Sequence, residues 1–299
     1  MKLVTFSTGD GKTQAGVVSN SSVSALAYPT LLELLHDPAG LSSAAVVLQQ
    51  GAATSQYALD EVTLLAPVPN PPTMRDFYAF EQHVKNARTK RGLSMIPQWY
   101  EAPIFYFTNT SEIYGHGSEV PYPSGSEELD FELEIACIIG REGRDIAVED
   151  AAQYIAGYTI MNDWSARDFQ RRDMQLNLGP GKGKDFATSL GPWLVTPDEL
   201  ASRRTGHGAT ERYDMTMLAC INGKEISRGN FKDIHFSFSQ MIAWAGRNAR
   251  LRVGDVLGSG TVGTGCILEI GTEAQRWLKR GDVVALEIDG IGRLRNRIC

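Results

Sequence analysis

The chain has 299 residues, of which 42% are hydrophobic and 21% charged, and its 29 Lys and Arg against 35 Asp and Glu give a formal net charge of −6. This composition excludes a disordered chain and is typical of a globular protein with a substantial core. The acidity and the lack of a Lys/Arg block argue against nucleic acid or an anionic membrane as the main partner and favour a small-molecule substrate. No apolar run reaches 18 residues and no signal-like segment opens the chain, so we expect a cytoplasmic protein without a membrane span.

Short apolar runs alternate with Gly/Ser turns in residues 1–68, and one helix-like stretch covers residues 30–36. This pattern predicts a small, mostly β amino-terminal domain. Four prolines between residues 67 and 72 remove backbone donors and favour extended chain, as in a linker. We therefore place a domain boundary at residue 68, with a second domain at residues 69–299.

The second part of the chain is richer in strand-like than in helix-like segments. Strands are expected at residues 104–108, 131–139, 157–161, 193–196, 215–221, 255–257, 266–270 and 283–288, and helices at residues 148–155 and 238–247. Many short strands and 30 glycines favour a β-rich α+β fold over a doubly wound parallel sheet. The four cysteines, at positions 137, 220, 266 and 299, form no C-x-x-C pair, so we expect reduced thiols rather than a disulfide framework or a zinc knuckle.

Acidic and apolar residues alternate from residue 130 to residue 135. On a strand, Asp130, Glu132 and Glu134 would share one face, because successive side chains point to opposite sides. Such a face is either solvated or neutralised by a hard cation. The run continues directly into apolar residues 135–139, typical of a buried strand, and this favours the cation.

Two further acids stand at positions where sites are often assembled. Asp163 lies where an apolar strand gives way to a polar turn, and Asp76 follows the proline-rich linker. Oxygen ligands without clustered His or Cys predict Mg²⁺, Mn²⁺ or Ca²⁺ rather than zinc.

Five short motifs are specific when taken together. They are Asp76-Phe77-Tyr78 with Gln82-His83, Glu132-Leu133-Glu134, the MNDWSARD segment at residues 161–168, Lys184-x-Phe186-x-Thr188, and Ser259-Gly260-Thr261. The combination resembles the fumarylacetoacetate hydrolase family from Pro69 to the carboxyl terminus. The resemblance implies a mixed β-sandwich roll, usually dimeric, preceded in many members by a small amino-terminal β domain.

The resemblance also implies a chemistry and a set of site residues. Members cleave a carbon–carbon bond in a β-diketone acid, with water as the nucleophile and Mg²⁺, Mn²⁺ or Ca²⁺ as the cofactor. His83 matches the general base, Glu269 its carboxylate partner and Lys184 the lysine that stabilises developing negative charge. Glu269 alternates with apolar neighbours, so an outward-facing strand residue is the other interpretation. The matched metal ligands are Asp76, Glu132, Glu134 and Asp163.

Substrate contacts are implied for Tyr78, Gln170 and Thr261. Arg91 lies in the basic segment 84–100, which we interpret either as a mobile cover that brings cations to an anionic substrate or as a solvated basic helix. Met174 stands near the place of a second substrate tyrosine, which favours an acylpyruvate over fumarylacetoacetate itself. A related branch of the family carries His-x-x-Glu, whereas this chain has Asn86 at the Glu position, and this favours Glu269 as the partner of His83.

Two other functions stay open at this point. The same metal site would serve a decarboxylase, tautomerase or lyase of a 2-oxo acid such as oxaloacetate. A metal-stabilised binding protein without activity is the alternative of a different class, and the joint presence of His83, Lys184 and the four acids argues against it.

Overall fold

The computed structural model describes residues 1–51, 53 and 55–299 of the chain. Its largest element is a twelve-stranded sheet with the order β4-β3-β2-β1-β15-β13-β11-β21-β6-β7, with β5 paired to β1 and β8 to β15. The strands of this sheet are β1 (Lys2–Ser7), β2 (Thr13–Ser19), β3 (Ser22–Ala25), β4 (Gln56–Ala58), β5 (Thr63–Leu64), β6 (Met74–Phe77), β7 (Phe105–Thr108), β8 (Ile113–Tyr114), β11 (Leu133–Ile139), β13 (Ile155–Asp163), β15 (Thr188–Val195) and β21 (Val256–Gly258).

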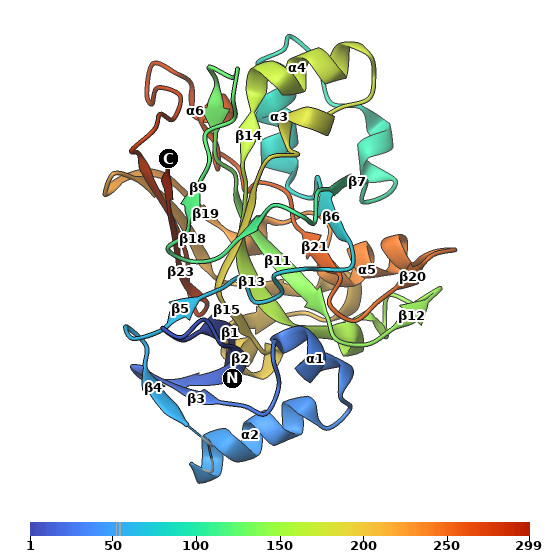
Figure 1. The fold of residues 1–299 in the computed structure, drawn as a ribbon. Helices are drawn as coiled ribbons and strands as arrows, with labels where there is room; N and C mark the ends of the chain where they lie inside the picture. The colour runs from blue at the N-terminus through green and yellow to red at the C-terminus, as the bar shows by residue number, and fades with distance from the viewer. Residues whose placement is uncertain (52, 54) are drawn as a thin grey trace.

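A five-stranded sheet with the order β19-β18-β22-β23-β9 packs against the middle of the first sheet (Figure 1). Its strands are β9 (Glu119–Val120), β18 (Thr216–Ile221), β19 (Lys224–Asn230), β22 (Val283–Ile288) and β23 (Gly292–Ile298). Three two-stranded pairs complete the strands: β10 (Leu129–Asp130) with β14 (Ser165–Ala166), β12 (Gly143–Arg144) with β20 (Arg250–Leu251), and β16 (Arg204–Thr205) with β17 (Arg212–Tyr213).

The central strands β11 and β13 are buried along their whole length. On β11, Ile135 and Cys137 face a core shared with the five-stranded sheet, while Ala136 and Ile138 face a second core that includes Leu34. A strand covered on both faces has no solvent side, so its sequence is a continuous apolar run rather than an alternation.

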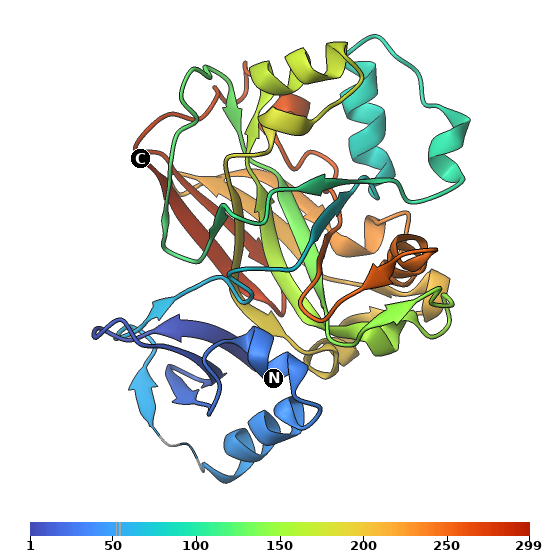
Figure 2. The same ribbon diagram turned by 45° about the vertical axis from the view of Figure 1, so that its right-hand side comes forward.

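The helices lie at two ends of the molecule. Figures 1 and 2 show α1 (Leu31–His36) and α2 (Gly40–Gln50) against the amino-terminal strands, whereas α3 (Glu81–Thr89), α4 (Arg167–Gln175) and α6 (Ile267–Ile270) gather at the opposite end. The remaining α-helix is α5 (Phe238–Gly246), which begins with a capping box between Ser237 and Gln240. No helix in the described part of the chain is both long and apolar enough to cross a membrane.

The β-rich α+β fold predicted from the sequence is confirmed, but several local predictions are wrong. Residues 266–270, expected as a strand, contain the short helix α6, and residues 148–155, expected as a helix, contain only a 3₁₀ turn (Ala151–Tyr154) ahead of β13. In segment 84–100, α3 occupies the first part, as the helix interpretation expected, and a 3₁₀ turn (Pro97–Tyr100) the last, while a mobile cover stays a prediction. The domain boundary at residue 68 stays a prediction; β1 pairs with β15 through Lys2 and Val195, so the amino-terminal strands continue the large sheet.

Candidate active site

Four buried carboxylates converge where neighbouring strands of the large sheet end. Asp76 lies on β6, Glu134 on β11 and Asp163 at the last position of β13, while Glu132 immediately precedes β11. One oxygen of each lies within 4.8 Å of the others. Strand pairing in the order β13-β11-β21-β6 brings together the four acids that the family resemblance implied, and their role as metal ligands stays a prediction.

The close approach of Asp76 depends on a glycine in the strand between β6 and β11. Gly258 on β21 pairs with Asp76 on one side and with Ala136 on the other. A Cβ atom at Gly258 would lie only 2.6 Å from Oδ1 of Asp76. A larger residue at this position would therefore displace the carboxylate.

The cluster holds more negative charge than its neighbours balance. Burial, reinforced by the repulsion of Asp163, raises the pKa of Asp76 to about 7, and burial with the neighbouring acids raises the pKa of Glu134 well above its ordinary value. Burial also favours the neutral form of Glu132, but Lys184, Arg167 and His83 outweigh it and lower the pKa of that carboxyl. Oδ1 of Asp163 is buried and has no hydrogen-bond partner among the described residues. An unsatisfied carboxylate oxygen among crowded acids is the arrangement that a divalent cation relieves.

Among the described residues, Lys184 is the lysine whose ammonium group contacts the four-carboxylate cluster directly. Its Nζ lies 2.6 Å from Oε2 of Glu132 and 2.8 Å from Oδ2 of Asp163. The side chain is buried, yet the attraction of the two acids exceeds the cost of burial, so its pKa is raised and it stays protonated at neutral pH.

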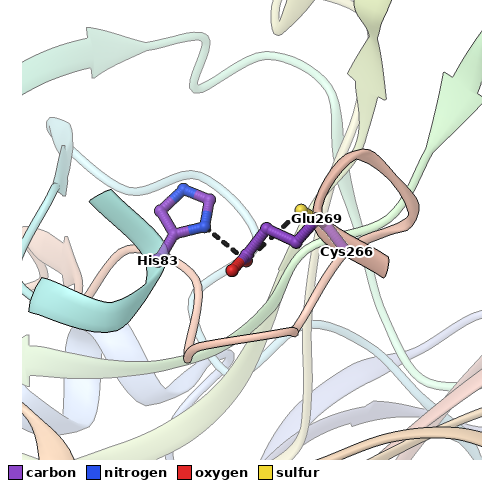
Figure 3. A group of neighbouring side chains, drawn as sticks. All are labelled: His83, Cys266 and Glu269. Atoms are coloured by element: carbon purple, nitrogen blue, oxygen red, sulfur yellow. Dashed lines mark hydrogen bonds and ion pairs between the residues drawn. The ribbon is translucent and has the colours of Figure 1, made fainter. Parts of the chain in front are cut away.

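A histidine–carboxylate pair stands beside the cluster. Nδ1 of His83, on α3, lies 2.5 Å from Oε1 of Glu269, on α6, and Figure 3 shows the imidazole ring pointing toward the carboxylate. The other oxygen of Glu269 accepts hydrogen bonds from Nδ2 of Asn86 at 2.8 Å and from the backbone N–H of Thr264 at 2.9 Å. The pair predicted from the sequence is thus formed, although Glu269 sits on a short helix rather than on a strand.

Several of these groups line a cavity of about 570 Å³. Its lining includes, of the residues singled out from the sequence, Asp76, Tyr78, His83, Arg91, Glu132, Gln170, Lys184 and Thr261. Glu134, Asp163 and Glu269 lie directly behind this lining and bond to Gly260, Lys184 and His83, respectively. A second hollow, of about 950 Å³, lies between β4, β5 and β23 and contains none of these residues.

Asp130 is not part of the cluster, so the expectation that it shares a face with Glu132 and Glu134 is wrong. The chain leaves the strand conformation at residues 131–132, where the N–H of Glu132 donates to the side-chain oxygen of Asn162 instead of to a strand partner. Asp130 instead accepts hydrogen bonds from the N–H groups of Ile267 and Leu268, at 2.7 and 3.0 Å, at the start of α6.

Sequence reasoning assigned no role to Arg167, although the MNDWSARD motif contains it. Its guanidinium is buried and donates to Asp130 and Glu132, both at 2.8 Å, and to Oε1 of Gln170 at 2.9 Å. Arg167 therefore links the acidic cluster, through Asp130, to the helix that carries Glu269.

Tyr106 is a second residue that sequence reasoning missed. Its hydroxyl lies 3.0 Å from Oδ2 of Asp76 and also contacts Oδ2 of Asp163. No local pattern marked it, because Tyr106 reaches the acids only through the pairing of β6 with β7.

The mouth of the cavity is basic and partly apolar. Lys90, Arg91 and Arg171 line it together with Ile104 and Met174. Arg171 is held by Glu128 at 2.7 Å, whereas Nε of Arg91 donates to the backbone oxygen of Ala87 at 3.1 Å. This end of the cavity suits an anionic ligand with an apolar portion.

Comparison with known proteins decides the family. Residues 73–299, most of the chain, match the family described as fumarylacetoacetate (FAA) hydrolase C-terminal. The chain belongs to the fumarylacetoacetate hydrolase family.

Relatives and solved structures in this family have several activities. Fumarylacetoacetase of Oryza sativa subsp. japonica is 30% identical over 71% of this chain and 62% of its own length, so the chain spans less than two thirds of that enzyme. The human oxaloacetate tautomerase FAHD2A, mitochondrial, is 31% identical over 84% of this chain and 78% of its own length. The solved structure of the fumarylacetoacetate hydrolase from Exiguobacterium antarcticum has a TM-score of 0.75 and 25% identity, covering 100% of this chain and 99% of that one. This likeness confirms the family fold expected from the sequence.

Proposed function

We propose that the chain is a divalent-metal-dependent enzyme that hydrolyses a carbon–carbon bond in an acylpyruvate-type β-diketo acid. The observation that carries the proposal is that His83, Asp76 and Glu132 line one cavity, while Glu269 and the other two carboxylates of the cluster lie directly behind this lining. A base that can activate water, His83, and an oxygen-rich site for a hard cation would then both act on a substrate bound in this cavity.

The donor set fits a hard divalent cation. Asp76, Glu132, Glu134 and Asp163 offer only oxygen, which suits Mg²⁺, Mn²⁺ or Ca²⁺, and the unpartnered Oδ1 of Asp163 supplies a free ligand atom. When bound, such an ion polarises the two oxygens of a 1,3-dicarbonyl group and stabilises the enolate that leaves.

His83 moves the proton in this mechanism. A charged Glu269 can only accept at Nδ1, so the Nδ1 atom carries the hydrogen and Nε2 is left to take a proton from water. The water oxygen adds to the acyl carbon, and the bond from this carbon to the methylene breaks. The electron pair of this bond forms pyruvate enolate, whose methylene carbon takes back the proton from Nε2 of His83, so the products are a carboxylic acid and pyruvate.

The remaining polar residues hold charge and orient the substrate. Lys184 and Arg167 are fixed cations beside the place where negative charge develops, and they stabilise it without reorganisation. We assign Gln170, Thr261 and Tyr78 to substrate contacts because they line the cavity around His83. Arg91, at the mouth, is assigned to a distal anionic group of the substrate.

A second candidate is a 2-oxo acid tautomerase or decarboxylase on the same site. The 31% identity to a human oxaloacetate tautomerase, over a larger share of both chains than the plant fumarylacetoacetase, favours it. Enolate stabilisation by a metal serves both reactions.

A substrate panel separates the two candidates. Protein loaded with Mg²⁺ or Mn²⁺ is assayed on acylpyruvates for pyruvate and the matching acid, and on oxaloacetate for enol–keto exchange and CO₂. We expect pyruvate and acid in a one-to-one ratio, lost on chelation. Turnover of oxaloacetate without any cleavage of acylpyruvates would overturn the hydrolase in favour of the second candidate.

A further inference from the structure

The thiol of Cys266 lies beside the His83–Glu269 pair, and the mechanism above makes no use of it. Its Sγ is 3.6 Å from Oε1 of Glu269, the same oxygen that Nδ1 of His83 approaches at 2.5 Å (Figure 3). One nitrogen, one sulfur and one oxygen thus lie within 4.8 Å of one another, on three buried side chains. The three atoms have different ligand chemistry from that of the oxygen-only cluster nearby.

We propose that His83, Cys266 and Glu269 form a second metal site, which binds zinc or a similar borderline-soft divalent ion. Imidazole nitrogen, thiolate and one carboxylate oxygen are ligands of zinc in proteins, whereas Mg²⁺ and Ca²⁺ prefer oxygen alone. The two sites therefore select different ions from the same solution.

The distances are close to those that a tetrahedral ion requires. Zn–N and Zn–O bonds of roughly 2.0–2.2 Å and a Zn–S bond of roughly 2.3 Å place the ligand atoms about 3.3–3.6 Å apart. The Sγ–Oε1 separation of 3.6 Å already satisfies this, and the Nδ1–Oε1 separation of 2.5 Å has to widen by less than about 1 Å. A small backward shift of the His83 ring is enough.

The carboxylate is already oriented for this role. Oε2 of Glu269 is held by Asn86 and Thr264, so Oε1 is the oxygen turned toward both His83 and Cys266. Outer hydrogen bonds of this kind fix ligand direction in metal sites. His83 lines the cavity, so an ion enters through the same opening as the substrate, and a water fills the fourth position.

Zinc in this site would oppose catalysis. Binding would convert the Cys266 thiol to a thiolate, with its proton released to solvent. The hydrogen on Nδ1 of His83 would move to Nε2, and the Nδ1–H hydrogen bond would be replaced by a metal–nitrogen bond. The imidazole would then no longer be poised by Glu269 to take a proton from water. This loss of turnover rests on the proposed function of His83, whereas zinc binding itself does not.

Cobalt titration tests the site directly. The full chain, carrying Cys220→Ser and Cys299→Ser to remove the less buried thiols, is saturated with Mg²⁺ and titrated with Co²⁺ as a spectroscopic substitute for zinc. We expect a thiolate-to-cobalt charge-transfer band that saturates at one equivalent and is displaced by one equivalent of Zn²⁺. Adding Cys266→Ser should abolish the band, weaken Zn²⁺ binding at least about tenfold and leave Mg²⁺-dependent turnover unchanged.

Cys137 provides the matched control. This thiol is also fully buried, but the described residues place it in no cluster of metal-binding side chains. Cys137→Ser should therefore keep the band. Absence of the band in the parent protein, or its survival after Cys266→Ser, would overturn the proposal. A band with one-to-one stoichiometry, combined with undiminished Mg²⁺-dependent turnover when zinc is bound, would support the metal site and contradict the role of His83.

Discussion

Nδ1 of His83 lies 2.5 Å from Oε1 of Glu269, although 186 positions separate the two residues and each stands on a different short helix. Burial favours the neutral form of Glu269, but His83 and the donors Thr264 and Asn86 outweigh it, so the pKa of this carboxyl is lowered. Glu269 is therefore charged at neutral pH and accepts the Nδ1 hydrogen. The pair fixes both the ring and the nitrogen that is left free to act as a base.

Glu269→Gln tests this relationship. An amide can donate as well as accept, so the substitution no longer fixes the hydrogen on Nδ1. We expect kcat on an acylpyruvate to fall by about 100-fold or more, with little change in KM. Glu273→Gln, on an exposed side chain just beyond α6, is the control and should retain full activity. A kcat within threefold of the parent after Glu269→Gln would contradict the orienting role.

The acidic cluster predicts how metal and pH act on stability. Burial, with repulsion from Asp163, raises the pKa of Asp76 to about 7, so the folded chain binds a proton that the unfolded chain has already released above about pH 4. The free energy of unfolding without metal should therefore fall as pH rises from about 4 through 7. Divalent ions favour the charged carboxylates and reverse this loss.

Thermal melts measure this effect. At about 100 times its Kd, Mn²⁺ or Mg²⁺ should raise the Tm by about 5 °C near pH 8. The gain should shrink near pH 5, where protons compete for the carboxylates. A monovalent salt at equal ionic strength serves as the control. Melts that are indifferent to metal and chelator would count against the cluster as a cation site.

A substitution of Lys184 is expected to impair catalysis without weakening metal binding. Its ammonium touches Glu132 and Asp163 and repels a cation in the cluster. Lys184→Met should therefore lower kcat by about 100-fold, through lost stabilisation of developing charge, while the metal Kd stays the same or becomes tighter. Lys182→Met, an exposed lysine paired with Asp185, is the matched control. Weaker metal binding after Lys184→Met would contradict this assignment.

Asp130→Asn tests the link from the acidic cluster to α6. The substitution removes the charge that faces Arg167 and one acceptor for the N–H groups of Ile267 and Leu268. We expect a loss of about 3 kcal/mol in the free energy of unfolding, measured with urea, and a lower kcat because Glu269 is carried by the same helix. Asp214→Asn weakens only exposed contacts, with Lys232 and with the side chain of Asn230, and should cost less than about 1 kcal/mol. Equal effects of the two substitutions would refute the link.

The four acids that meet in the structure could be singled out from the sequence, where the family resemblance selected them as a set. Glu132 and Glu134 are two positions apart on an extended segment, Asp163 ends an apolar strand, and Asp76 opens the part of the chain after the proline cluster. Each of these acids is therefore recognisable from its neighbours in the sequence, and strand pairing brings the four acids together. The β-rich fold was predictable for a similar reason, because buried strands such as β11 and β13 are continuous apolar runs.

What the sequence could not reveal depends on contacts between distant residues. The alternation of Glu269 with Leu268 and Ile270 fits a strand, yet Asp130, far away in the chain, accepts the first N–H groups of the segment and favours a helix there. The same contact explains why Asp130 leaves the acidic face. Tyr106 reaches the cluster only through the β6–β7 pairing, which no local pattern predicts.

The most direct test of the account is the His83→Asn variant, assayed for acylpyruvate hydrolysis and for metal binding on the same preparation. Asn keeps polarity and approximate size but cannot accept a proton from water at neutral pH. The account predicts that kcat falls by at least about 100-fold while the rise in Tm on adding Mn²⁺ equals that of the parent protein. Hydrolysis at the parent rate, with metal bound, would contradict the claim that His83 activates water at this site.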